Sequence, residues 1–360
     1  MKNITYIPII KTSDAEFRCL DSLSDNVKNN LTPLFELTRS RVSKEFPEGN
    51  IFKRLNKIKE VFGERRFILD LHSELVNQQI RDLQDSSNGY EQWVQFAISC
   101  KDVYPELIPA VQISDEGVDT EEEYKERLRQ QVISLDKHFN SIVYRFPIAY
   151  EYFEDDLSVI CSALSTKKLI CIIDAEYILK GKSDDNARKA IEILQALSKY
   201  AQIGRVGLSG TSFPKNPTEF GRDEYGEYLL EECLFFQKVN TAKSGLKLIY
   251  SDYATVNPII NDQAGGRGWV PRIDMPTKEE LFYHRSRKGK KEMSYVSSYG
   301  RVAKMVVNES RYKVVKKQIP NCWGINQIEM AADGNPPGLS PSFWISVRMS
   351  IHITLRTMFV

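Results

Sequence analysis

Polar or charged side chains end most of the short apolar runs in this sequence, where a parallel sheet would present them at one edge. We interpret six of them as candidate catalytic residues: Lys11, Glu36, Asp70, His72, Arg145 and Asp174. Three carboxylates with a histidine can hold a hard divalent cation such as Mg²⁺ or Mn²⁺. A lysine with an arginine can hold a phosphate or a carboxylate. The set therefore predicts metal-assisted phosphodiester hydrolysis, with Glu36, Asp70 and Asp174 as the metal ligands.

A structural interpretation of the same residues stays open. Strands in any fold end where polarity begins, and buried Glu–Lys or Asp–Arg pairs also close barrel interiors. The pairs Asp70/His72 and Asp174/Glu176 have a spacing that places both members on one side of a strand, but this spacing is common. The sequence contains no HExxH, GxSxG, P-loop or GxGxxG motif in the context that such motifs need. The acidic strand ends thus either bind metal or form structural ion pairs.

A second group of residues, after the later apolar runs, is expected to bind a ligand or its phosphate. Gly207, Ser209 and Gly210 resemble a small anion-binding turn. Barrels often bind phosphate near their seventh and eighth strands. The residues expected to contact a ligand are Ser209, Gly210, Ser212, Asp252, Tyr253, His284 and Arg285.

The segment 284–291 carries six basic residues in eight positions, and tyrosines are interleaved with the cations that follow it. Such a local patch is typical of surfaces that contact phosphate backbones and nucleic-acid bases. We expect nucleic-acid contacts from Arg287, Lys288, Lys290 and Lys291. The alternative is a solvated loop without a ligand.

Composition excludes several classes of protein. The 49 basic and 48 acidic residues give a net charge of +1, which excludes a uniformly basic nucleic-acid coat but not a local patch. Hydrophobic residues make up 42%, enough for a core. The six cysteines form no CxxC motif, so neither a zinc ribbon nor a dense disulfide framework is expected. Because no signal peptide and no long apolar run occurs, we expect a cytoplasmic protein without membrane contact.

Eight apolar, β-branched runs alternate with amphipathic stretches, and each interval has the length of a βα unit. Their continuous hydrophobicity suits parallel strands that are covered on both faces. This pattern predicts an α/β fold, a (β/α)8 TIM-like barrel. A doubly wound open sheet is the competing fold, although its usual glycine-rich first turn is absent. The predicted strands are 6–10, 34–37, 67–71, 107–112, 142–146, 169–174, 205–209 and 247–251.

The surplus length falls between the eighth strand and the last helix. We expect a barrel core at 1–256, an insertion at 257–339 on the carboxyl-terminal face, and a closing barrel helix at 340–360. Within the insertion, 269–274 and 280–285 are expected to pair as a β-hairpin. Helical stretches are expected near 294–309 and 323–332. Ser340 and Pro341 form a suitable cap and first-turn pair for the closing helix.

Several short segments resemble one known family. They are Tyr6-Ile-Pro-Ile-Ile-Lys11, Thr32-Pro-Leu-Phe-Glu36, Ser251-Asp-Tyr-Ala254, the hairpin from Trp269 to Arg285, Trp344, and His352-Ile-Thr354. Together they are similar to the beta family, named after a bacteriophage T4 beta protein. The resemblance spans nearly the whole chain. One departure is Ser251, where the family usually has glycine.

The resemblance implies a setting but no reaction, because no activity of the family is established. Beta family members occur in phage, in bacterial mobile elements and in defence neighbourhoods. One hypothesis is an enzyme that hydrolyses phosphodiesters in a nucleotide or nucleic acid, with the insertion as a lid. The other is a non-catalytic scaffold or sensor subunit of a defence complex, which binds nucleic acid or a protein partner.

Overall fold

Eight parallel strands form the larger of two sheets. The computed structural model describes residues 4–72, 77–165, 169–216, 224–242, 245–259, 268–286 and 294–359. The strand order is β4-β3-β2-β1-β9-β7-β6-β5, and every neighbouring pair is parallel. The strands are β1 (Tyr6–Lys11), β2 (Leu34–Leu37), β3 (Phe67–Leu71), β4 (Leu107–Pro109), β5 (Ile142–Pro147), β6 (Leu169–Tyr177), β7 (Ile203–Thr211) and β9 (Leu248–Asp252).

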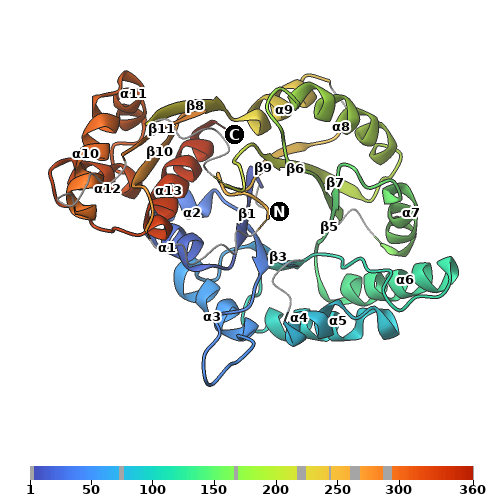
Figure 1. The fold of residues 1–360 in the computed structure, drawn as a ribbon. Helices are drawn as coiled ribbons and strands as arrows, with labels where there is room; N and C mark the ends of the chain where they lie inside the picture. The colour runs from blue at the N-terminus through green and yellow to red at the C-terminus, as the bar shows by residue number, and fades with distance from the viewer. Residues whose placement is uncertain are drawn as a thin grey trace.

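The sheet nearly closes into a barrel, which confirms the predicted fold. An isolated parallel bridge joins Ala110 to Val143 and so links β4 and β5, the two ends of the strand order. Val111 N donates to Val143 O at 2.7 Å across the same junction. The regular strand β4 stops at Pro109, short of the predicted 112, although Ala110 N still donates to Leu69 O at 2.9 Å. Figure 1 shows the barrel along its axis, with helices around its outside.

The helices that cover the barrel follow the strands as expected for βα units. They are α1 (Asp14–Ser22), α2 (Asp25–Asn29), α3 (Ile51–Phe62), α4 (Gln78–Gln84), α5 (Ser87–Lys101), α6 (Glu121–His138), α7 (Phe153–Ala163), α8 (Ser183–Leu197) and α9 (Glu231–Asn240). Their apolar faces pack on the outward residues of the strands, such as Tyr6 and Ile10 of β1. The inward residues, such as Ile7 and Ile9, form a separate core inside the barrel. Both faces of each strand are therefore buried, which accounts for the continuous apolar runs.

A smaller unit contains a three-stranded antiparallel sheet of order β10-β11-β8. Its strands are β8 (Tyr225–Leu229), β10 (Arg272–Pro276) and β11 (Glu280–Arg285). The predicted hairpin is confirmed, with Arg272 opposite Arg285 and Pro276 opposite Leu281. The strand β8 was not expected; it lies inside the range 1–256, yet it pairs with β11. Only part of its pattern is apolar, so it lacks the signal of the barrel strands.

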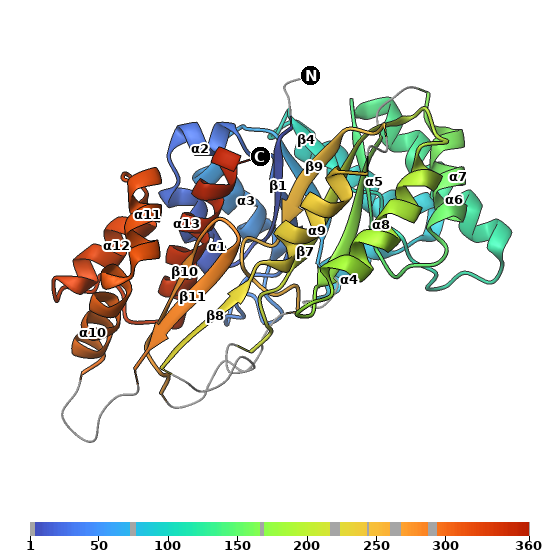
Figure 2. The same ribbon diagram turned by 90° about the horizontal axis from the view of Figure 1, so that it is seen from above.

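Four helices complete the smaller unit. They are α10 (Tyr295–Asn308), α11 (Ser310–Gln318), α12 (Trp323–Ala332) and α13 (Pro341–Phe359). Side chains from β10, β11 and all four helices form one further core. The last helix, α13, also packs on α1 of the barrel, and Figures 1 and 2 show it between the barrel and α12. Among the described residues, no helix is long and apolar enough to cross a membrane.

Candidate active site at the barrel mouth

The barrel places five of the predicted site residues at one level of its interior. Residues two apart on a strand share a face, so Lys11, Glu36, Asp70, Arg145 and Asp174 follow interior residues of the same strands. The interior residues that precede them are Ile9, Leu34, Ile68, Val143 and Ile172. The polar layer therefore lies at the carboxyl-terminal end of the barrel, which we call the barrel mouth.

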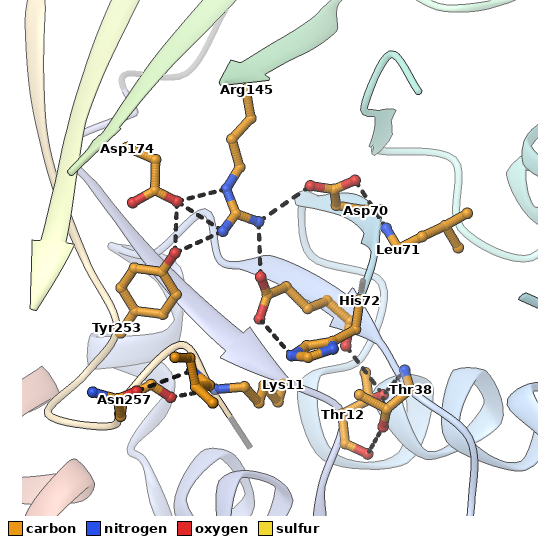
Figure 3. Close-up of polar contacts among 12 residues, drawn as sticks. Lys11, Thr12, Thr38, Asp70, Leu71, His72, Arg145, Asp174, Tyr253 and Asn257 are labelled. Carbon is orange, nitrogen blue, oxygen red and sulfur yellow. Dashed lines mark hydrogen bonds and ion pairs between the residues drawn. The ribbon is translucent and has the colours of Figure 1, made fainter. Parts of the chain in front are cut away.

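Arg145 is the centre of this layer (Figure 3). Its Nε donates to Asp174 Oδ2 at 2.9 Å, and its Nη1 donates to Glu36 Oε1 at 2.8 Å and to Asp70 Oδ2 at 3.2 Å. Its Nη2 donates to the Tyr253 hydroxyl at 2.7 Å and lies 2.8 Å from Asp174 Oδ2. A guanidinium has five N–H groups. Four hydrogen bonds and one further ion-pair contact join the guanidinium to these four side chains, which with Arg145 form the Arg145 cluster.

The oxygens of the cluster differ in how fully they are bonded. Asp174 Oδ2 also accepts from the Tyr253 hydroxyl at 2.6 Å, and Asp174 Oδ1 accepts from the backbone N of Glu176. Asp70 Oδ1 accepts from the backbone N of Leu71 and from the side chain of Gln112. In contrast, Glu36 Oε2 is buried and accepts no hydrogen bond from a described residue. This oxygen lies 3.8 Å from Nε2 of His72.

The two carboxyl groups that share Arg145 Nη1 have pKa values shifted in opposite directions. Burial opposes ionisation of Glu36, but the positive charges of Arg145, His72 and Lys11 hold its pKa below the usual 4.5. Burial raises the pKa of Asp70 above the usual 3.8, and the charge of Glu36 adds to this effect. Pairs of carboxyl groups with separated pKa values are typical of acid–base catalysis. Asp70 and Arg145 keep the most exposure in the cluster, with side chains 14% and 15% exposed.

The backbone beside the cluster is strained. Glu176 follows Asp174 with φ of +51°, and Ala254 and Thr255 follow Tyr253 with φ of +49° and +65°. Residues other than glycine rarely adopt this left-handed backbone conformation, and a β-branched threonine is especially disfavoured there. Such strain persists where the surroundings hold it in place, often at functional sites. Here it sets the direction of the chain directly after Asp174 and Tyr253.

Lys11 and His72 lie at the side of the cluster (Figure 3). Lys11 Nζ donates to the backbone O of Asn257 at 2.5 Å. The amide of Asn257 in turn donates to Phe213 O. These contacts attach the segment after β9 to the ends of β1 and β7. Asn257 and Gln112 were not among the expected site residues. Asn257 lies beyond the last apolar run, whereas Gln112 ends the fourth run and so carries the same signal as the residues that were selected.

Among the other expected ligand residues, Tyr253 belongs to the Arg145 cluster, and Ser209 lies beside the cluster as the register partner of Asp174 on the neighbouring strand. Ser209 is fully buried, and its hydroxyl makes no hydrogen bond to a described residue. Ser212 binds both the backbone N of Glu231 and the carboxylate of Glu232 at the start of α9. A Cβ at Gly210 would lie 2.7 Å from Ile178. The expected anion-binding turn is thus engaged in packing, and it stays a prediction as a ligand site.

The remaining expected residues have partners elsewhere. Asp252 binds His352 of α13, and His284 Nε2 lies 2.9 Å from Glu309. Arg285 is buried at the end of β11. The expected nucleic-acid contacts Arg287, Lys288, Lys290 and Lys291 lie outside the described residues.

The predicted metal ligands hold a guanidinium instead of presenting an open ligand set. Glu36, Asp70 and Asp174 each accept from Arg145. Within the described ranges, no group of three or more His, Cys, Asp or Glu residues is arranged to hold a metal ion. A divalent ion could bind these carboxylates only if the Arg145 side chain moved away. The metal site therefore stays a prediction that depends on this movement.

Comparison with known proteins gives the family. The family model described as Beta protein matches residues 6–356. The chain belongs to the Beta protein family. It is similar to Protein beta of Enterobacteria phage P4, with 26% identity over 358 residues, which cover 98% of this chain and 92% of the phage protein. The Beta protein family resemblance seen in the short segments is therefore confirmed, and this relative comes from phage P4 rather than T4.

Proposed function

We propose that this Beta protein family member is a phosphodiester hydrolase whose active site is the barrel mouth. One observation carries the proposal: Glu36 and Asp70 share Arg145 Nη1, yet their pKa values shift in opposite directions. The lowered pKa favours the ionised form of Glu36 and the raised pKa favours the protonated form of Asp70, so we assign the proton-accepting role to Glu36 and the proton-donating role to Asp70. Ester hydrolysis by general acid–base catalysis uses one group that accepts a proton from water and one that donates a proton to the leaving oxygen.

The reaction follows from these two roles. Glu36 Oε2, which accepts no hydrogen bond from a described residue, takes a proton from water. The water oxygen forms a bond to phosphorus as the bond between phosphorus and the leaving oxygen breaks. Asp70 gives its proton to that leaving oxygen. Arg145 keeps both carboxyl groups in place, since its donors are directed at the cluster rather than at a substrate.

The charge of the substrate must be balanced by other groups. Lys11 and His72 are the basic side chains beside Glu36, and Lys11 contributes to its lowered pKa. A divalent ion, if bound after movement of Arg145, would supply further positive charge for the reacting phosphate. The relative from phage P4 supports a phage-associated setting. In that setting a nucleotide or nucleic acid is the substrate that we propose.

The test is turnover of bis(p-nitrophenyl) phosphate, a dinucleotide and a single-stranded oligonucleotide, each with EDTA, Mg²⁺ or Mn²⁺. We expect Asp70→Asn and Glu36→Gln to lower kcat by about 100-fold or more. The matched control variants are Asp155→Asn and Glu192→Gln, which change exposed carboxylates on α7 and α8. Full activity in both site variants would contradict the proposal.

The non-catalytic alternative is distinguished by the same panel. If the wild-type protein turns over none of these substrates under any metal condition, the hydrolase proposal is wrong. The Arg145 cluster would then be a structural element of a binding scaffold or sensor. In that case, a partner protein from a defence complex would be sought by affinity capture on the wild-type protein, with Glu36→Gln as the control bait.

A further inference from the structure

The exposed face of α10 carries a row of hydrogen-bond donors, and the helix itself contains no acidic residue. Ser297, Arg301, Lys304 and Asn308 are exposed and recur at helical spacing, while Val302, Ala303 and Val306 on the opposite side are buried. The row is about 16 Å long at the helical rise. No Asp or Glu occurs from 294 to 308. We call these four residues the α10 stripe.

The cations of the α10 stripe differ from Arg311 and Lys316 on α11 in their ion pairs. Arg311 on α11 contacts Glu227 and Glu280, and Lys316 contacts Glu329. Arg301 and Lys304 form no ion pair with any residue that the structure describes. Their charge is thus available to a ligand from solution.

The α10 stripe borders a hollow of about 640 Å³. Gly300 allows α10 to approach α12 closely, since a Cβ there would lie 3.2 Å from Ala331 O. This approach brings the turn at Gly334 beside the helix, and the hollow lies between them, with Ser294 and Met305 also in its lining. Apart from Met305 and Val296, the side chains around it are polar or absent.

An exposed aromatic ring lies at the start of the same helix. Trp269 is 39% exposed and stacks on Tyr295 of α10, with ring centroids 4.6 Å apart. Its Nε1 donates to Leu339 O, and its backbone N donates to the Tyr295 hydroxyl. The ring is therefore fixed in place while part of it faces solvent. Fixed aromatic rings beside cations are platforms on which unpaired bases stack.

The charge of the smaller unit matches a polyanion. Residues 268–359, which hold the smaller unit apart from β8, contain fifteen Lys and Arg but seven Asp and Glu, whereas the whole chain is nearly neutral. We propose that the α10 stripe and Trp269 bind single-stranded nucleic acid, with phosphates along the stripe and a base on the Trp269 ring. A lipid headgroup or an acidic peptide would use the cations but not the aromatic ring. The site goes beyond the proposed hydrolase because it uses none of the residues at the barrel mouth.

The test is binding of a labelled single-stranded DNA of about 12 nucleotides by fluorescence anisotropy at several salt concentrations. Arg301→Ala with Lys304→Ala is expected to reduce the salt slope by about 0.7 for each cation removed. The control is Arg129→Ala with Lys189→Ala, which removes the same charge from α6 and α8. Asp70→Asn is expected to bind like wild type, so failure of the hydrolase and failure of this site are distinguishable.

The aromatic contact has its own readout. Trp269→Ala is expected to weaken binding by about 5- to 150-fold, the range for loss of one stacked base. Tryptophan fluorescence should be quenched by the DNA in wild type, and Trp269→Phe should lose the quenching while it keeps binding. The proposal is overturned if the strand does not bind, if duplex DNA or anionic vesicles bind instead, or if the α10 variant equals its control.

Discussion

His352 Nε2 and Asp252 Oδ2 lie 2.6 Å apart, and both side chains are fully buried. The other oxygen of Asp252 accepts from the Tyr6 hydroxyl at 2.7 Å and from the backbone N of Ala254 at 2.8 Å. One carboxylate therefore joins α13, β1 and the turn after β9. The next residue, Tyr253, binds Asp174 and Arg145 at the barrel mouth. The pair thus supports the segment that completes the Arg145 cluster.

The His352–Asp252 pair predicts a dependence of stability on pH. Burial lowers the pKa of His352 below 6.5, although Asp252 opposes the shift. The unfolded chain therefore takes up a proton that the folded chain does not, and stability falls as pH falls through 6.5. We expect the difference in unfolding free energy between wild type and His352→Asn to shrink from about pH 7.5 to about pH 5.5. Urea denaturation measures it, with the exposed His138→Asn as control.

Glu232 predicts the opposite trend. Burial, with a contribution from the charge of Asp252, raises the pKa of Glu232 to about 7. Below 4.5 both states hold the proton, but between 4.5 and 7 only the folded state does, so stability is lost as pH rises through this window. Glu232→Gln should gain roughly 3 kcal/mol relative to wild type between about pH 4 and about pH 8. A constant difference across that range would exclude ionisation of Glu232 as its cause.

The barrel mouth predicts a bell-shaped pH profile for hydrolysis. Activity needs ionised Glu36, whose pKa lies below 4.5, and protonated Asp70, whose pKa lies above 3.8. We expect kcat/KM to fall at low pH as Glu36 takes up a proton and to fall at higher pH as Asp70 loses one. The residual rate of Asp70→Asn should lack the higher-pH decline. A profile for Asp70→Asn that keeps both declines would assign the proton donor to another group.

Replacement of Arg145 tests the metal prediction. Arg145→Ala leaves Glu36, Asp70 and Asp174 without their shared cation, which should cost about 3–5 kcal/mol of stability. The same change opens three carboxylates to a divalent ion. We expect Mn²⁺ to raise the Tm of Arg145→Ala more than that of wild type, with EDTA as the control. Equal shifts in the two proteins would show that the carboxylates do not bind the ion even when Arg145 is absent.

Gly226 on β8 tests the packing of the smaller sheet. A Cβ at this position would lie 2.6 Å from the hydroxyl and 2.7 Å from the ring of Tyr283 on β11. Gly226→Ala should therefore cost about 1–3 kcal/mol, as overpacking usually does. Tyr283→Phe is the matched variant, because the Tyr283 hydroxyl has no hydrogen-bond partner among described residues and its loss should change the Tm little. If Gly226→Ala left the unfolding free energy unchanged, the Tyr283 ring would have to move aside without cost.

The sequence predicts the barrel well because each strand is buried on both faces. Continuous apolar runs, such as Leu169–Ile173, can be recognised without knowledge of their neighbours. The same periodicity locates the Arg145 cluster, since Glu36 and Asp174 lie two residues after interior residues. In contrast, β8 is exposed along much of its length and is defined by its partner β11, which only the three-dimensional structure supplies.

The chemistry of the site could not be predicted from residue types alone. Asp70 and Glu36 are both acids at strand ends, and their different pKa values come from their burial and from the side chains around each of them. Arg145 was expected to hold a phosphate or a carboxylate, and in the structure it donates to three carboxylates and to the Tyr253 hydroxyl. The contact between Asp252 and His352 joins positions 100 residues apart, so spacing does not indicate it.

Helix α13 also limits how far the chain can fold while it is still being synthesised. Its Met349 and Ile353 complete the core between barrel and helices, while Val347, Ile351 and Leu355 complete the core of the smaller unit. The first strand, β1, likewise cannot pair with β9, its neighbour in the sheet, until β9 has been synthesised. Neither core is therefore complete until α13 has been synthesised. Nascent chains that stop before Pro341 should expose apolar surface of both units at once and become substrates for chaperones or proteases.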